Sequence, residues 1–528
     1  MEPDDPIGAY AAERFGVAYL YPYQRLVVAN VLDAVGTASD DDGPARQIVI
    51  LPTGAGKSLC FQLPAALCPG PTLVVYPLLG LMADQARRLE GTGASAVTLR
   101  GGMPGDDRRK ALESIRSGAA RVVITNPETL RAPGVASALA EAGPSHFVID
   151  EAHCVAEWGD SFRPAYLSLG EAIRAIRPRV VTAFTATASP PILARVAEVL
   201  FGDEPYGLVS GAPDRPNIRY SVRPALSMRR ELRAAAAAMP KPMIVFARSR
   251  PGVQLLAEDL LGARPGLDCR FYHAGLDKAE RAAVEAWFMG SDDGVLCSTC
   301  AYGMGMDKAN VRSVVHYGPP ASVEAYLQES GRAGRDGEPS EALLIRKAEP
   351  GERSIGDGRL DRDRPTAGSN GPQLGPSEAR AETMRLYASG NYGCRRSFLL
   401  AALGYPGAAE TACSSCDRCD GTAAESAPGA AELAAIAARH PRRFDAAGLA
   451  AFAIGAGDAA TAPLRGTLSG WMPDEAGEAV AAALGAGLLR RRGRRPWKGS
   501  ISPGTRRRPA RQPRPRRPPE AGTTSWPS

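Results

Sequence analysis

The chain alternates short, continuous apolar runs with longer stretches of helical periodicity. In its first part the runs fall at residues 47–51, 72–76, 121–125, 147–150 and 180–184. The same pattern returns further along, at residues 243–246, 294–297, 314–317 and 342–345. Continuous apolar strands separated by helices are typical of a parallel sheet that helices cover on both faces. We therefore predict an α/β protein with two parallel-sheet lobes in tandem, over residues 1–211 and 212–347.

The composition changes after the second lobe. Residues 348–378 are rich in Gly, Pro, Asp and Ser and are predicted to be a linker. Residues 379–421 hold four closely spaced cysteines and are predicted to form a small helical module. Ala- and Leu-rich helices and a hairpin are expected over residues 430–505. Residues 506–528 are rich in arginine and cannot form a core, so we predict a disordered basic tail.

The chain has 528 residues, of which 44% are hydrophobic and 23% are charged. These proportions are ordinary for a globular protein of several domains. No run approaches the roughly 18 apolar residues of a membrane-spanning helix, and the acidic N-terminal residues do not resemble a secretory signal. These features exclude a membrane protein, a secreted disulfide scaffold and a wholly disordered chain, and we expect a cytoplasmic protein.

The formal net charge of +6 conceals an uneven distribution. Residues 490–517 contain 13 Lys and Arg residues and no acidic residue, which leaves 50 basic and 57 acidic residues elsewhere. One interpretation is a tail that binds phosphates, with each contact adding salt-dependent affinity. The other is a solvated terminus of biased composition that has no specific partner.

A phosphate-binding motif, LPTGAGKS at residues 51–58, follows the first apolar run. Glycines let the backbone turn back so that its N–H groups point at phosphate oxygens, and the following helix adds a favourable field. Lys57 is expected to reach the β- and γ-phosphates of a nucleotide, and Ser58 to hold Mg²⁺. The general pattern has Gly where this chain has Leu51, but the Gly-Lys-Ser core is intact. The candidate phosphate-binding residues are Thr53, Gly54, Ala55, Gly56, Lys57 and Ser58.

The sequence DEAH at residues 150–153 ends the fourth apolar run. Asp150 would lie at the carboxyl edge of a parallel sheet, where such sheets bind ligands, and would bind the magnesium through water. Glu151 is positioned to orient or deprotonate the attacking water, and His153 completes the motif. A surface acidic pair is the alternative, but the place of the motif beside a P-loop favours nucleotide hydrolysis.

The second lobe supplies arginines in the sequence QESGRAGRDG, which begins at the candidate catalytic residue Gln328. Arg332 and Arg335 are three residues apart and would share one face of a helix. Facing the first lobe, they would stabilise charge on the γ-phosphate, an effect worth ~10³–10⁵ in rate. Salt bridges between the lobes are the alternative. A Gly-rich segment nearby favours the nucleotide contact, and its candidate residues are Gly305 and Asp307.

Together these motifs resemble superfamily 2 helicases and, more closely, the RecQ family, in the same order over residues 15–420. The most specific part is DEAHCVAEWGDSFRPAY at residues 150–166, which is similar to the RecQ DEAH box and its aromatic-rich loop. The resemblance implies two RecA-like lobes and an ATP- and Mg²⁺-dependent 3′→5′ DNA helicase that serves recombination and repair. Its expected partners are single-stranded and duplex DNA and a single-strand-binding protein, in association with the nucleoid.

The resemblance assigns a DNA-binding role to the aromatic-rich loop. In the family this loop couples DNA binding to hydrolysis, and Trp158, Phe162 and Arg163 carry that role over. Trp and Phe stack on unpaired bases, worth ~1–3 kcal/mol each. Packing in the core is the alternative. Asp160 stands where the family usually has His, which places an acid on the DNA side.

The entry motif near residue 20 departs from the family pattern. Gln24, the expected reader of the adenine edge of ATP, is retained. The aromatic residue on which the base stacks in the family is replaced by Val17, and its basic residue is replaced by Tyr21. Either Tyr19 or Tyr21 would have to provide the stacking surface instead.

In this family the cysteine segment is a zinc module. The four cysteines are Cys394, Cys413, Cys416 and Cys419, and the last three form two adjacent C-x₂-C steps. Four thiolates satisfy tetrahedral Zn²⁺ without an open position, which predicts a structural metal. An iron–sulfur cluster is the alternative, but the spacing fits its signatures less well. The other six cysteines lie among apolar segments and are predicted to be buried free thiols.

Beyond residue 430 the resemblance is weak. Residues 433–500 are interpreted as a degenerate winged helix, in which Trp497 is either a strand-separating wedge or a packing residue. Two other functions remain open: an RNA helicase or non-unwinding translocase, and a nucleic-acid-binding scaffold with little turnover. The cysteine module and Trp158 argue against the first, and the intact Lys57, Glu151 and Arg335 argue against the second.

Overall fold

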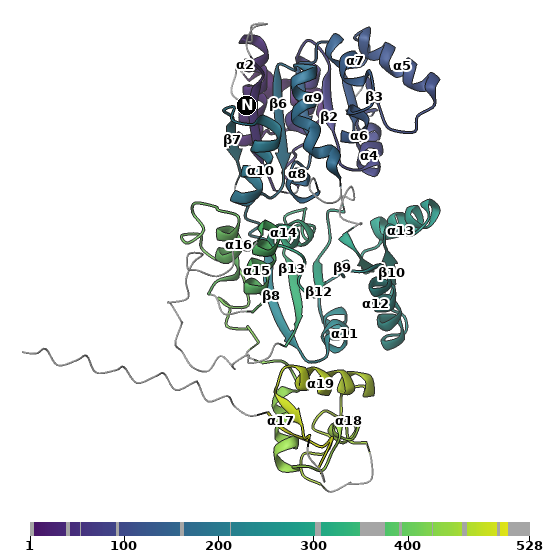
Figure 1. Cartoon of the computed structure of the whole chain (residues 1–528), viewed down its shortest axis with the longest axis vertical. Coiled ribbons are helices and arrows are strands. Elements are labelled where there is room, and N and C mark those ends of the chain that lie inside the picture. The colour runs from purple at the N-terminus through teal and green to yellow at the C-terminus, as the bar shows by residue number, and fades with distance from the viewer. Residues whose placement is uncertain are drawn as a thin grey trace, which may run out of the picture. The chain divides into compact units, whose positions relative to one another are not determined.

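A computed structural model describes most of the chain and divides it into two compact units (Figure 1). The first unit is Met1–Arg223, Glu231–Arg346 and Leu360–Ala424, and the second is Pro224–Arg230, Lys347–Arg359 and Glu425–Ser528. The described residues are 5–37, 43–52, 54–90, 94–158, 163–211, 213–300, 308–348, 375–389, 393–424, 426–456, 462–493 and 497–504. Within these ranges no helix combines the length and the apolar character needed to cross a bilayer.

The first lobe is built on a seven-stranded parallel sheet in the order β3-β4-β2-β5-β6-β1-β7. The strands are β1 (Ala45–Ile50), β2 (Thr72–Val75), β3 (Ala96–Thr98), β4 (Val122–Thr125), β5 (His146–Ile149), β6 (Val180–Thr185) and β7 (Gly207–Ser210). The helices are α1 (Pro6–Phe15), α2 (Pro22–Thr37), α3 (Leu59–Leu67), α4 (Leu79–Glu90), α5 (Gly105–Arg116), α6 (Pro127–Leu130), α7 (Val135–Glu141), α8 (Cys154–Trp158), the 3₁₀ helix η1 (Pro164–Ser168), α9 (Leu169–Ile176) and α10 (Pro190–Phe201).

Both faces of this sheet are buried, which explains the continuous apolar runs. Successive residues of a strand point to opposite faces. In β2, Leu73 and Val75 belong to one hydrophobic core, while Val74 and the following Tyr76 belong to the other. Since every position of the strand is covered, none needs to be polar.

The second lobe has a six-stranded sheet in the order β10-β11-β9-β12-β13-β8. Its strands are β8 (Ile218–Ala225), β9 (Met243–Phe246), β10 (Cys269–Tyr272), β11 (Val295–Ser298), β12 (Ser313–Tyr317) and β13 (Ser340–Lys347). Its helices are α11 (Met228–Ala238), α12 (Arg250–Ala263), α13 (Lys278–Gly290) and α14 (Val323–Ser330). The predicted fold class, two RecA-like parallel-sheet lobes in tandem, is confirmed.

The cysteine module shares its hydrophobic core with the second lobe. Its helices are α15 (Pro376–Ser389) and α16 (Arg395–Ala402). Tyr387 and Cys416 of the module lie in the same buried cluster as Tyr220 of β8 and Tyr326 of α14. Asp417 donates its backbone N–H to the carbonyl of Tyr220 at 3.0 Å. The module is therefore an extension of the second lobe rather than an independent domain.

Two buried arginines follow Cys394 and fasten the module. Arg395 forms a two-pronged ion pair with Asp417, with Nε 2.9 Å from one carboxylate oxygen, and both side chains are buried. Asp417 also accepts the backbone N–H of Val222 at 2.9 Å. Arg396 pairs with Asp214 and donates to the carbonyl of Ile218 at 2.8 Å. The module is thus held by charge as well as by apolar packing.

Replacing Asp417 by alanine is expected to lower the free energy of unfolding by about 3–5 kcal/mol, because it leaves Arg395 buried and unpaired. Denaturant unfolding of the full chain, with its metal content checked, measures this. Asp420→Ala is the matched control, because Asp420 pairs with Arg219 at 2.9 Å and both side chains are about one-third exposed. The control should lose less than about 1 kcal/mol, and equal losses in the two variants would contradict the prediction.

The described residues from 426 onward form three helices and a two-stranded antiparallel sheet in the second unit. These are α17 (Ala430–Arg439), α18 (Ala446–Ala453), α19 (Pro473–Gly485), β14 (Leu489–Arg491) and β15 (Ile501–Pro503). Leu226 packs in the core of this unit, and Arg230 lies over the Trp471 ring, 4.5 Å from its centroid. Pro224–Arg230 thus belongs to this unit, although the sequence placed it within the second lobe.

Most of the predicted linker and the whole of the predicted tail lie outside the described residues. Residues 349–374 of the predicted linker lie outside the described residues, and α15 already begins at Pro376, within the range expected to be linker. Residues 505–528, which include the predicted basic tail, also lie outside the described residues.

Candidate nucleotide-binding and hydrolysis site

The P-loop connects β1 to α3 at the carboxyl edge of the first sheet. Gly54 and Gly56 have φ angles of 86° and 73°, in the left-handed region that other residues rarely adopt. A Cβ atom on Gly56 would lie 2.5 Å from Nε2 of Gln24, so the Gln24 side chain would have to move. Ala55, Lys57 and Ser58 complete the described part of the loop, while Thr53 lies outside the described residues.

The carboxylates of the DEAH sequence lie beside this loop. Asp150 directly follows β5, and Glu151 has a positive φ of 52°. Lys57 Nζ lies 3.6 Å from Glu151 Oε1. Burial acts to raise the pKa of Glu151, but Lys57 above all, with His153 and Arg332, outweighs burial and lowers it. Burial and the charge of Glu151 raise the pKa of Asp150.

His153 joins the first lobe to the second. It is buried, and its Nδ1 lies 3.2 Å from the hydroxyl of Thr185 at the end of β6. Gln328 Nε2, on α14 of the second lobe, lies 3.2 Å from His153 Nε2. His153 Nδ1 is also 3.4 Å from Glu151. A continuous line of polar contacts thus runs from Lys57 through Glu151 and His153 to Gln328.

The spacing of Arg332 and Arg335 predicted a shared face only if their segment is helical, and it is not. Helix α14 ends at Ser330, and both arginines lie in the turns that follow. They nevertheless face the first lobe. Arg332 is buried and lowers the pKa of Glu151, after the larger effects named above. The Cβ position of Gly54 in the P-loop is 4.0 Å from Arg335 Cγ.

The entry motif lies against the P-loop. Gln24 is buried, donates from Nε2 to the carbonyl of Ala55 at 3.0 Å, and accepts the backbone N–H of Tyr21 at 2.9 Å. Tyr21 stacks on Tyr23 with their ring centroids 5.4 Å apart. The Tyr21 side chain is half-exposed. Tyr19 is exposed next to it. Val17 instead packs in a small apolar cluster.

The candidate DNA-binding residues are described only in part. Arg163 Nε lies 3.1 Å from Glu128 at the start of the first lobe's α6, and the guanidinium also donates to the carbonyl of Pro77. This contact brings together three segments that resemble the RecQ family. Trp158 ends α8, but its side chain lies outside the described part of the chain, as do Phe162 and the second-lobe residues Gly305 and Asp307.

The four cysteines predicted to bind metal lie together. The sulfur atoms of Cys394, Cys413, Cys416 and Cys419 are all within 4.8 Å of one another. Cys416 Sγ accepts the backbone N–H of Cys419 at 3.4 Å. Burial acts to raise the pKa of Cys394, but hydrogen bonds from Ser397 and the neighbouring thiols outweigh it and lower that pKa to about 7. Four converging sulfur atoms fit a tetrahedral Zn²⁺.

The remaining cysteines were predicted to be buried. Five of them are buried, but Cys300 is exposed, so the prediction was wrong for that residue. Cys300 follows the last residue of β11 by two positions, where the strand has already left the core.

Sequence motifs did not identify two residues that connect the lobes. The hydroxyl of Ser189, at the start of α10, donates to the carboxylate of Glu324 on α14. Serine before a helix is typical of an N-cap, and an acid in the first turn is typical of a helix start. Both residues therefore look like local helix signals in the sequence, and neither signal points to a contact 135 residues away.

Comparison with known proteins places these features in a family. Residues 21–195 match the family model described as DEAD/DEAH box helicase, and residues 227–337 match the helicase conserved C-terminal domain. The chain is 34% identical over 341 residues to the ATP-dependent DNA helicase RecQ of Pasteurella multocida, covering 64% of this chain and 52% of the relative. It is 36% identical over 324 residues to the ATP-dependent DNA helicase RecQ of Synechocystis sp., covering 59% of this chain and 67% of the relative.

Solved structures show the same fold. The helicase MrfA bound to DNA superposes with a TM-score of 0.54 at 22% identity, covering 66% of this chain and 49% of that chain. The helicase Lhr of Mycobacterium smegmatis, bound to ssDNA and AMP-PNP, superposes with a TM-score of 0.50 at 25% identity, covering 65% and 48%. The chain spans between about a quarter and two-thirds of the length of the curated relatives it matches. The chain belongs to the RecQ family of DEAD/DEAH box helicases.

Proposed function

We propose that the protein is an ATP- and Mg²⁺-dependent DNA helicase that moves 3′→5′ on single-stranded DNA and unwinds duplexes in recombination and repair. The observation that carries this proposal is the line of contacts from the P-loop lysine to the second lobe. Lys57 pairs with Glu151, His153 connects Glu151 to Gln328, and the turn after α14 brings Arg332 to the same carboxylate. Hydrolysis at this site depends on both lobes, and motion between the lobes moves the strand.

Each residue has a role in this scheme. Lys57 binds the β- and γ-phosphates, and Ser58 and Asp150 would hold Mg²⁺, which neutralises charge on the phosphates when bound. Glu151 orients the attacking water. Arg332 and Arg335, supplied by the second lobe, stabilise the charge that develops as the γ-phosphate leaves.

DNA is the proposed nucleic acid. Relatives over 30% identical carry the name DNA helicase, among them the RecQ proteins of Pasteurella multocida and Synechocystis sp.. Arg163, held by Glu128 and Pro77, would fix the end of the loop that begins at Trp158. Aromatic side chains at such a loop stack on bases of a single strand.

The cysteine module is proposed to hold one structural Zn²⁺. The convergence of four sulfur atoms supports it, since a closed set of four thiolates leaves no position for a substrate. A module that shares its core with the second lobe also places this metal where it can stabilise that lobe.

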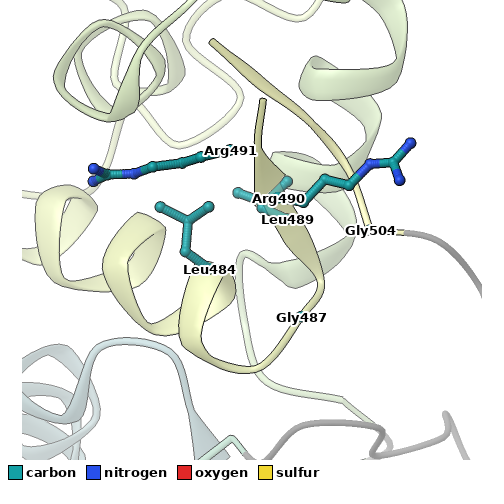
Figure 2. Close-up of a pocket in the computed structure, with 6 residues that line it drawn as sticks. All are labelled: Leu484, Gly487, Leu489, Arg490, Arg491 and Gly504. Atoms are coloured by element: carbon teal, nitrogen blue, oxygen red, sulfur yellow. The ribbon is translucent and has the colours of Figure 1, made fainter. Parts of the chain in front are cut away.

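The C-terminal unit is proposed to be a winged helix that contacts duplex DNA. Three helices followed by the β14–β15 hairpin support this assignment. Figure 2 shows Arg490 and Arg491 projecting from opposite faces of β14, and both line a pocket together with Leu484 and Leu489. Trp497 is half-exposed in the hairpin loop, with the Arg442 guanidinium 5.3 Å from its ring centroid. These cationic and aromatic side chains suit a phosphate backbone.

Strand displacement on tailed duplexes tests the proposed function. Duplexes with a 3′ tail, a 5′ tail or a fork, built from DNA or from RNA, are incubated with the full chain and either ATP or AMP-PNP. We expect displacement of 3′-tailed and forked DNA with ATP and none with AMP-PNP. Displacement of RNA alone would identify an RNA helicase. DNA-stimulated turnover without displacement would identify a translocase, and DNA binding without turnover would identify a scaffold.

A further inference from the structure

Helix α14 presents two residues to the first lobe. Glu324 lies in its first turn and Gln328 lies four residues later, so the two side chains share one face of the helix. Gln328 contacts His153, and Glu324 accepts a hydrogen bond from Ser189. Arg332 follows directly after this helix, in the turn that begins at Gly331. The position of α14 on the first lobe therefore determines where Gln328 and Arg332 lie.

The burial of Glu324 is not explained by its own helix. Only 4% of this residue is exposed. An acid in the first turn of a helix is favoured by the helix dipole, but an exposed glutamate would gain the same benefit. A carboxylate is costly to bury unless it is hydrogen-bonded. Glu324 accepts such a hydrogen bond from Ser189, which lies on the first lobe.

Ser189 is diverted from the role its position predicts. It occupies the N-cap position of α10, where a serine side chain usually accepts a backbone N–H from the second or third residue of the helix. Here it makes no cap hydrogen bond. The second residue is Pro191, which has no N–H. The hydrogen bond of the Ser189 side chain instead goes to the second lobe, where its hydroxyl donates to Glu324.

The segment that carries Ser189 is itself held firmly. Just before Ser189, the hydroxyl of Thr185 donates to the carbonyl of Thr187 at 2.9 Å. Thr185 also contacts His153. On the other side, Gly404 of the cysteine module packs closely on Pro190. A Cβ at position 404 would lie 2.7 Å from Pro190 Cγ, and the φ of Gly404 is 71°. Ser189 is thus a fixed anchor next to the candidate site.

We propose that Glu324 is a positioning residue for ATP hydrolysis. Its hydrogen bond with Ser189 holds α14 on the first lobe, so that Gln328 meets His153 and Arg332 stays near Glu151. Nucleotide binding depends on the P-loop of the first lobe and does not need this contact. The inference rests on the proposed function and adds a residue pair that none of the sequence motifs contains.

Steady-state ATP hydrolysis with saturating single-stranded DNA tests the proposal. Glu324→Ala and Ser189→Ala are each expected to lower kcat by about 10- to 100-fold, as the loss of one charge-assisted hydrogen bond implies. KM for ATP should stay within about twofold, because neither variant removes a contact that binds ATP in the ground state. Glu324→Gln, which keeps an acceptor for Ser189, should restore most of kcat. The double variant should be no slower than the slower single variant, since both remove the same bond.

Ser322→Ala is the matched control. Ser322 caps α14 by accepting the N–H of Ala325 at 3.2 Å and makes no contact with the first lobe in the hydrogen bonds described. It should weaken the start of the helix, seen as a lower unfolding temperature, and leave kcat within about threefold. A kcat loss in this control equal to that of Glu324→Ala would overturn the proposal, because a loosened helix would then suffice.

Other outcomes are equally decisive. Wild-type kcat in Glu324→Ala and Ser189→Ala would overturn this inference and leave the proposed function standing. An increase of KM as large as the fall of kcat would also overturn it, because the pair would then serve binding. If Glu324→Ala does not fold, Ser189→Ala and Glu324→Gln still decide the question. Absence of DNA-stimulated turnover in the wild-type chain would overturn the proposed function, and this inference with it.

Discussion

Replacing Arg332 by alanine is expected to lower DNA-stimulated ATP turnover by about 10³-fold or more, the range for a transition-state arginine. Arg332 is only 8% exposed and acts on Glu151 from the other lobe. Negative charge develops on the leaving-group oxygen as the bond between the β- and γ-phosphates breaks, so an arginine beside these phosphates matters most in the transition state. Lys57 and Ser58, the residues proposed to bind the nucleotide, both lie in the first lobe. Binding of a fluorescent ATP analogue should therefore change by less than about threefold.

Arg332→Lys should not restore turnover, because an ammonium cannot replace the planar, two-pronged guanidinium. Arg346→Ala is a control matched for burial. Arg346 is 7% exposed, lies on the second lobe's β13, and donates to the carbonyl of Ser389. It should lower stability but keep turnover of the folded protein within about threefold. Wild-type turnover in Arg332→Ala, or an equal loss of nucleotide binding, would show that Arg332 has no transition-state role.

The sequence could predict those parts of the site whose residues are neighbours along the chain. The P-loop works through a contiguous stretch of backbone, so Gly54, Gly56 and Lys57 identify it in the sequence. The double-sided burial of each strand makes the apolar runs continuous, as in β2, where Leu73 and Val74 enter different cores. Two tandem lobes follow from such runs.

The parts that sequence could not predict depend on partners far along the chain. Ser189 and Glu324 each carry an ordinary helix-start signal, and only the packing of the lobes makes them a pair. Arg332 and Arg335 would share a face only in a helix, but α14 ends at Ser330, just before Gly331 and Gly334. Pro224–Arg230 looks like part of the second lobe, yet Leu226 is buried in the C-terminal unit.

Removing the metal from the cysteine module is expected to unfold that module, because a structural Zn²⁺ typically contributes ~10–16 kcal/mol of apparent binding energy. The effect should extend further. Cys416 is fully buried and lies in one hydrophobic cluster with Tyr220, Tyr326 and Tyr387. Loss of the module exposes this side of the second lobe, including Tyr326 of α14. We expect chelator-treated protein to unfold at a lower temperature and to be cleaved by trypsin at Arg395 and Arg396, which are buried in the intact chain.

Cys416→Ser should reproduce these effects without chelator, because three thiolates and a hydroxyl hold Zn²⁺ less well than four thiolates. Cys300→Ser is the matched control, since Cys300 is exposed and outside the four-sulfur cluster. Elemental analysis should find one Zn²⁺ per chain in the wild type and in the control, and less in Cys416→Ser. Full zinc occupancy in Cys416→Ser would remove that thiol from the site. If iron with acid-labile sulfide is found, the metal centre is an iron–sulfur cluster instead of zinc, since the same four cysteines satisfy either centre.

Arg395 and Asp417 lie between these cysteines in the sequence, so the metal and the ion pair stabilise the same structure. Removing either one should make the chain more sensitive to loss of the other.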